Sequence, residues 1–90
     1  MNPKVYNKYA NDIPHNAVYI GRPSIWGNPF VIGKDGNRDE VIAKYKQWIS
    51  NQPELINRAK QELRGKSLVC YCSPKPCHGD ILLDIANQSQ

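Results

Sequence analysis

The stretch Ser67-Leu-Val-Cys-Tyr-Cys-Ser-Pro-Lys-Pro-Cys-His-Gly-Asp80 predicts a strand, a loop and the start of a helix. Residues 67–72 begin with a short apolar run, which is typical of a strand inside a sheet. Pro74 and Pro76 cannot continue a strand ladder, because proline has no backbone N–H to donate. From Gly79 onward the apolar residues recur at helical spacing. Such a strand–loop–helix corner is where α/β proteins commonly place their chemistry.

Further strands and loops are predicted upstream of this corner. Residues 17–20, Ala-Val-Tyr-Ile, are rich in strand-forming side chains, and residues 30–32, Phe-Val-Ile, predict another short strand. Residues 21–29 hold two glycines and two prolines, so a structured loop is expected there. Residues 1–16 are polar and predict an N-terminal arm. The chain is therefore expected to be one domain, residues 1–90, with a folded core at 17–87.

Two helices are predicted between these segments. Asn37 and Glu40 have the spacing of a capping box, and Pro53 suits the first turn of a second helix. The element order is then strand, strand, helix, helix, strand, helix. This order predicts an α/β (or α+β) fold with a small mixed sheet of about three strands covered by three helices. The crossover through two helices is long enough to make the strands at 17–20 and 67–72 parallel neighbours.

Composition narrows the class of protein. Ninety residues allow one small core, and a net charge of +4 permits an anionic partner without requiring one. No apolar run approaches the roughly 20 residues that cross a bilayer, and the N-terminus does not resemble a secretion signal. We therefore expect no membrane partner and a cytoplasmic location, in which the three clustered cysteines stay reduced. The oligomeric state is left open.

The cysteines suggest three interpretations. Cys70, Cys72, Cys77 and His78 are four potential zinc ligands within nine residues, although their spacing is unlike that of usual zinc knuckles. Alternatively, Cys77 is a reactive thiol at a helix N-terminus, with His78 or Asp80 as acid or base. The third interpretation is packing, since buried cysteine behaves as a small hydrophobic residue, and Cys70 fits this best.

The loop at residues 21–30 has the composition of a binding loop. Arg22 suits a phosphate or carboxylate, Trp26 a stacked base, and Asn28 a base edge or ribose. Ser24 and Lys75 complete the predicted ligand-binding set. In the alternative interpretation Trp26 is a lid over the core, and the Asn28 side chain bonds to the backbone. If the flanking strands are parallel neighbours, this loop and the cysteine loop line one pocket.

The motifs of the two loops resemble the domain of unknown function 4326 family, a family of small domains in bacteria and phages. The resemblance rests on Tyr19-Ile-Gly-Arg-Pro-Ser24, Trp26-Gly-Asn-Pro-Phe30, Gly65-Lys-Ser-Leu68, Cys70-Tyr-Cys72 and Pro74-Lys-Pro-Cys-His-Gly-Asp80, and it spans residues 17–86. It implies little chemistry. The occurrence of some members beside nucleotide-handling or phage genes favours a nucleotide or nucleic acid as partner.

These observations predict a small domain that binds a nucleotide or nucleic acid between the loops at residues 22–28 and 72–80. One alternative is a small enzyme that acts on such a ligand through a Cys/His/Asp site. Another is a zinc-stabilised protein-interaction domain, with zinc as the possible cofactor. The chain has no glycine-rich phosphate loop, which argues against an NTPase.

Overall fold

The computed structural model describes residues 3–71 and 75–88, and it has the predicted α/β architecture. The predicted order of elements is confirmed. In chain order the elements are β1 (Val5–Asn7), β2 (Val18–Tyr19), α1 (Arg38–Ile49), α2 (Pro53–Glu62), β3 (Leu68–Cys70) and α3 (His78–Ala86).

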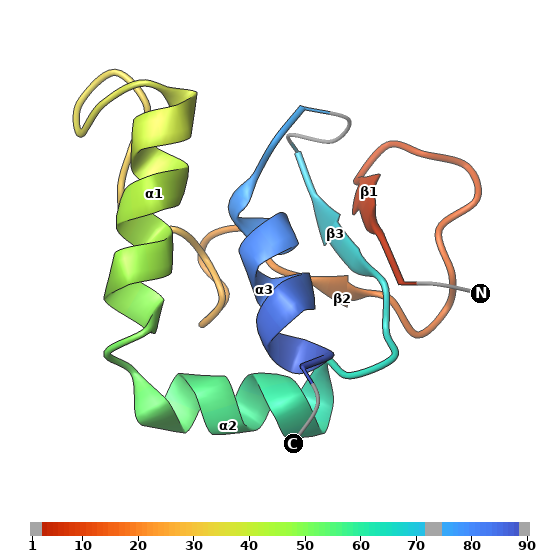
Figure 1. Cartoon of the computed structure of the whole chain (residues 1–90). Helices are drawn as coiled ribbons and strands as arrows, with labels where there is room; N and C mark the ends of the chain where they lie inside the picture. The colour runs from red at the N-terminus through yellow and green to blue at the C-terminus, as the bar shows by residue number, and fades with distance from the viewer. Residues whose placement is uncertain (1–2, 72–74, 89–90) are drawn as a thin grey trace.

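The sheet is parallel throughout, with β3 in the centre and the strand order β1-β3-β2 (Figure 1). Val5 and Val18 lie opposite Leu68 on its two sides. All three residues of β3 are buried, as is usual for a central strand covered by helices. The prediction that β2 and β3 are parallel neighbours is confirmed.

Part of the segment expected to be an arm is in fact an edge strand, β1. The backbone N–H of Leu68 donates to the carbonyl of Lys4, and that of Lys8 donates to the carbonyl of Cys70, both at 2.9 Å. A buried central strand must have hydrogen-bond partners on both sides, and β1 supplies the second side. Three residues in a polar setting show no periodicity, which is why the sequence pattern missed this strand.

The strand predicted at residues 30–32 is wrong, because side chains of its own loop take its backbone donors. The N–H of Phe30 donates to Asn28 Oδ1 at 2.9 Å, and the N–H of Val31 donates to Asp35 Oδ2 at 2.8 Å. Ile32 forms only an isolated bridge with Gly36. Short polar side chains can satisfy the backbone locally in this way and compete with a sheet ladder.

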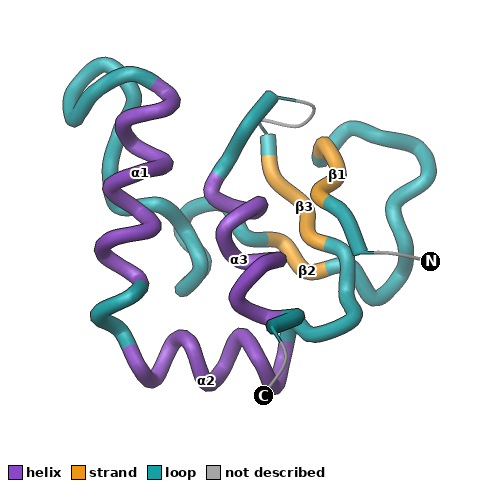
Figure 2. The backbone as a smooth tube through the Cα atoms, viewed as in Figure 1, coloured by secondary structure: helices purple, strands orange, loops and turns teal. Residues whose placement is uncertain are grey.

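The helices begin where capping chemistry predicts. Asn37 Oδ1 accepts from the N–H of Glu40, and Glu40 Oε1 accepts from the N–H of Asn37, both at 2.9 Å, so the capping box is confirmed. Pro53 is the first residue of α2. Helix α3 contacts β3 as well as α1 and α2, and it lies between the sheet and the other two helices (Figure 2).

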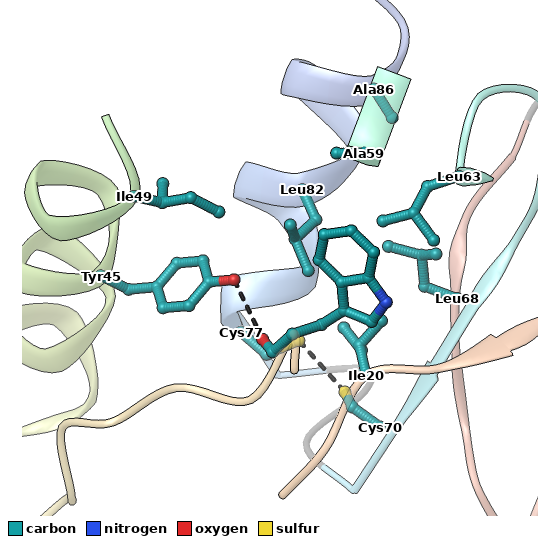
Figure 3. Packing of buried hydrophobic residues seen from close by; sticks show 11 residues of the cluster. Ile20, Tyr45, Ile49, Ala59, Leu63, Leu68, Cys70, Cys77, Leu82 and Ala86 are labelled. Atoms are coloured by element: carbon teal, nitrogen blue, oxygen red, sulfur yellow. Dashed lines mark hydrogen bonds between the residues drawn. The ribbon is translucent and has the colours of Figure 1, made fainter. Parts of the chain in front are cut away.

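The core lies around α3 and brings together side chains from every helix and from the sheet (Figure 3). The buried Tyr45 hydroxyl donates to the carbonyl of Trp26 at 2.9 Å and so ties the loop after β2 to α1. A Cβ on Gly79 would lie 2.8 Å from Ile20 Cδ1 and from Val5 Cγ2, so the first turn of α3 is pressed against the sheet. Within residues 3–71 and 75–88, no helix has the length and apolar character needed to cross a membrane.

Candidate ligand-binding site

A cavity of about 540 Å³ opens at the carboxyl edge of the sheet. It lies beyond the ends of β2 and β3, against the first residues of α1 and α3. Open parallel sheets commonly bind ligands at this edge, and the volume is within the range of small-molecule pockets. Six side chains of the lining carry nitrogen or oxygen groups, namely Tyr19, Arg22, Asn28, Arg38, Tyr71 and His78.

The two loops that the sequence singled out line this one cavity, as the parallel strands predicted. Five of the predicted site residues lie in its wall: Arg22, Asn28, Cys70, Cys77 and His78. Four others lie outside the lining: Ser24, Trp26, Lys75 and Asp80. Cys72 is outside the residues that the structure describes.

Trp26 is placed as a lid over the core, which corrects its prediction as a stacking residue. Its side chain is only 4% exposed, and the Arg58 guanidinium lies 5.9 Å from its ring centroid. Asn28 also follows the alternative interpretation, because its Nδ2 donates to the carbonyl of Val41 at 3.1 Å and its Oδ1 accepts from Phe30. These two residues shape the loop.

Two arginines from different elements line the cavity. Arg22 follows β2, and Gly27 leaves room for its aliphatic stem, because a Cβ there would lie 2.8 Å from Arg22 Cγ. Arg38 begins α1, and its Nη1 donates to the carbonyl of Pro76 at 3.2 Å, which leaves other guanidinium donors available. In the described part of the chain, neither arginine has a carboxylate within salt-bridge distance.

The sequence did hold one signal for Arg38 that was not used. A cation in the first turn of a helix lies at the positive end of the helix dipole, where it is unfavourable. The cost is small, about 0.3–1 kcal/mol, so this position was a weak signal. Its neighbours Asp39 and Glu40 are the usual acidic residues of a first turn.

His78 is neutral at pH 7 and has a defined tautomer. Its Nε2 lies 2.8 Å from the carbonyl of Ile20, and because a carbonyl only accepts, Nε2 carries the proton. Burial lowers the pKa of His78, and the charge of Arg22 lowers it further, against the opposing effects of the Ile20 hydrogen bond and Asp80. The other ring nitrogen, Nδ1, is therefore a hydrogen-bond acceptor.

Cys77 caps the N-terminus of α3. Its Sγ accepts from the N–H of Gly79 at 3.2 Å, and Asp80 Oδ2 accepts from the N–H of Cys77 at 3.3 Å. The same Sγ lies 3.1 Å from Cys70 Sγ (Figure 3). Asp80 thus has a structural partner, and catalytic roles for Cys77, His78 and Asp80 stay a prediction.

The described residues do not form the predicted zinc site. No group of three or more Cys, His, Asp or Glu residues in the described ranges could hold a metal ion. His78 directs its Nε2 to Ile20 although Cys70 and Cys77 are adjacent, so these three ligands do not converge. The fourth predicted ligand, Cys72, lies outside the described ranges.

A lysine–tyrosine pair at the cavity was missed by the sequence pattern. Lys8 Nζ donates to the Tyr71 hydroxyl at 2.9 Å and lies 5.1 Å from the ring centroids of both Tyr71 and Tyr19. This hydrogen bond lowers the pKa of the Tyr71 phenol and raises the pKa of Lys8. Lys8 lay in the expected arm, and only its pairing through β1 brings it here.

The fold and the cavity define a small α/β domain with a cationic pocket at the carboxyl edge of its sheet. Residues 4–88 match the family described as Domain of unknown function (DUF4326), and the chain belongs to this family. It is 39% identical over 89 residues to the "Uncharacterized 12.4 kDa protein in nrdA-td intergenic region" of Enterobacteria phage T4. That alignment covers 94% of this chain and 78% of the phage protein. No solved structure matches the chain.

Proposed function

We propose that this protein binds a nucleotide in the cavity at the carboxyl edge of its sheet, with Arg22 and Arg38 on the phosphate. The observation that carries the proposal is that these two arginines line one cavity and have no carboxylate partner among the described residues. Guanidinium groups present planar, paired donors that match phosphate oxygens. Arg22 is exposed and Arg38 is half-buried, so both guanidinium groups are open to an incoming anion, which the two positive charges at one cavity attract.

The rest of the lining supports a nucleotide over a simple inorganic anion. The volume of about 540 Å³ is much larger than a phosphate needs, and much of the wall is apolar, including Phe30, Val41 and Ile42. Tyr19 and His78 add neutral groups suited to a sugar or a base edge. A nucleotide fits this lining, because its flat base has apolar faces and polar edges and its phosphate is an anion.

The test is titration of the protein with the deoxynucleoside 5′-monophosphates and with the matching nucleosides, followed by isothermal calorimetry and amide chemical shifts. At least one monophosphate is expected to bind more tightly than its nucleoside. Arg22→Gln and Arg38→Gln are each expected to raise the Kd about 10- to 100-fold, as for the loss of a charged hydrogen bond. Lys75→Gln is the matched control, because Lys75 is an exposed cation outside the cavity lining.

Three results would refute the proposal. One is that no monophosphate binds. Another is that nucleosides bind as tightly as monophosphates, since phosphate would then contribute nothing. The last is that Lys75→Gln weakens binding as much as the two cavity variants, which would indicate a general charge effect.

A further inference from the structure

Three tyrosines form a row that leads out of the cavity. Tyr19 and Tyr71 line the cavity and pack edge to face, with ring centroids 6.1 Å apart. Tyr9 lies outside the lining, and its ring centroid is 5.9 Å from that of Tyr71. We call Tyr19, Tyr71 and Tyr9 the tyrosine row. Its middle member, Tyr71, is 51% exposed, and its outermost member, Tyr9, is 78% exposed.

The tyrosine row is held in place by the sheet. The N–H of Lys8 donates to the carbonyl of Cys70, and Asn7 Nδ2 donates to the carbonyl of Tyr71 at 3.2 Å, so the end of β1 is tied to the end of β3. The N–H of Tyr9 donates to Asn7 Oδ1 at 2.9 Å, which fixes the turn that carries Tyr9. Exposed aromatic rings held on a rigid scaffold are a feature of binding surfaces.

Positive charge lies along the tyrosine row. Lys8 contacts its two inner rings, and Arg22 and Arg38 lie in the cavity where the row begins. Within the described ranges, none of the three cations is in a salt bridge with a carboxylate. Aromatic rings beside cations that have no carboxylate partner suit single-stranded nucleic acids, because rings stack on bases and cations contact the backbone phosphates.

We propose that the tyrosine row and Lys8 extend the cavity into a binding site for single-stranded nucleic acid. This inference rests on the proposed nucleotide site, which holds one nucleotide of the strand. Tyr9 stacks on an adjacent base, and Lys8 contacts the backbone phosphate between the two. A free mononucleotide has no group that reaches Tyr9, and a duplex keeps its bases stacked away from such rings.

The decisive variant is Tyr9→Ala, assayed with a thymidine tetranucleotide and with thymidine 5′-monophosphate. Wild-type protein is expected to bind the tetranucleotide at least tenfold more tightly than the monophosphate. Tyr9→Ala raises the Kd of the tetranucleotide about tenfold, within the range of one base–aromatic stack. It leaves the Kd of the monophosphate unchanged. Tyr9→Phe keeps the ring and is expected to keep the affinity.

Three comparisons separate stacking from general effects. Ile25→Ala removes a large apolar side chain that is 47% exposed but does not line the cavity, and it is expected to change neither Kd. Lys8→Gln is expected to lower the salt dependence of tetranucleotide binding, with a change of about 0.7 in the slope of log K against log salt. A hairpin duplex long enough to stay paired is expected to bind at least tenfold more weakly than the tetranucleotide.

The outcomes distinguish this inference from the proposed function. If the monophosphate binds but the tetranucleotide gains nothing, or Tyr9→Ala leaves its Kd unchanged, the single-strand inference is overturned and the nucleotide site stands. If the tetranucleotide binds in a Tyr9-dependent way but no monophosphate binds, the tyrosine row stands and the cavity proposal fails. Equal affinity for the duplex overturns the single-strand inference.

Discussion

Replacing Gly79 by alanine tests how closely α3 is pressed against the sheet, and therefore how the site is positioned. A Cβ at this buried position would lie 2.8 Å from Ile20 Cδ1 and Val5 Cγ2, and 3.2 Å from Cys77 Sγ. Carbon atoms pack best at about 3.5–4.0 Å, so neighbours must move. Overpacking of this kind costs about 1–3 kcal/mol. Alanine is favoured over glycine in a helix by about 0.5–1 kcal/mol, so the middles of the two ranges leave a net loss of about 1 kcal/mol.

The assay is urea unfolding of a double-mutant cycle with Ile20→Val, a substitution that removes the crowded Cδ1 atom. Ile20→Val alone is expected to cost about 0.5–1.5 kcal/mol, because Ile20 is fully buried. In the Gly79→Ala background it is expected to cost about 1 kcal/mol less than that, since the Cδ1 atom no longer has to be accommodated. The slope of free energy against urea should stay the same in all four proteins.

The reasoning is refuted if Gly79→Ala is neutral or stabilising. It is also refuted if the two substitutions add to within about 0.3 kcal/mol, because residues in contact at 2.8 Å must be coupled. In either case helix α3 would have room to accept a side chain at its start. The positions of Cys77 and His78 at the cavity would then need another explanation.

Two further predictions concern the same corner of the molecule. Tyr45→Phe leaves the carbonyl of Trp26 without its buried donor, and urea unfolding is expected to show a loss of about 1–3 kcal/mol in the free energy of unfolding. The control is Tyr9→Phe at an exposed position, and an equal loss in the two variants would contradict the prediction. The pKa of His78 is lowered in the folded protein, so on acidification this histidine is protonated first in the unfolded chain. The free energy of unfolding should therefore fall as the pH drops below 6.5 toward 5, with no such effect above 6.5. His78→Gln should flatten this fall, and parallel curves for the two proteins would contradict it.

Elements defined by neighbouring residues were predictable from the sequence. The capping box of Asn37 and Glu40, and Pro53 at the start of α2, depend on contacts within one turn of helix. The apolar run of β3 has the composition of a central parallel strand wherever it is placed. The parallel pairing of β2 with β3 was enough to predict that the loops after these two strands line one cavity. These features need no knowledge of distant contacts.

Other features were decided only by tertiary structure. β1 forms because the backbone groups on the second side of β3 also need hydrogen-bond partners. The pairing of β1 with β3 brings Lys8 to Tyr71, 63 residues away in the chain. Trp26 carries a ring that suits either a ligand or the core, and the hydrogen bond from Tyr45 to its carbonyl helps to place it in the core.

The same distinction applies to the site as a whole. Composition, spacing and capping residues determined the three helices and the strands β2 and β3, because those choices depend on local hydrogen bonding and periodicity, whereas β1 depended on pairing with β3. The members of the cavity, Arg38 and Tyr71 among them, were decided by which elements pack together. The physical reason is that a side chain such as arginine or tyrosine can serve on any surface, and only long-range packing determines what faces it.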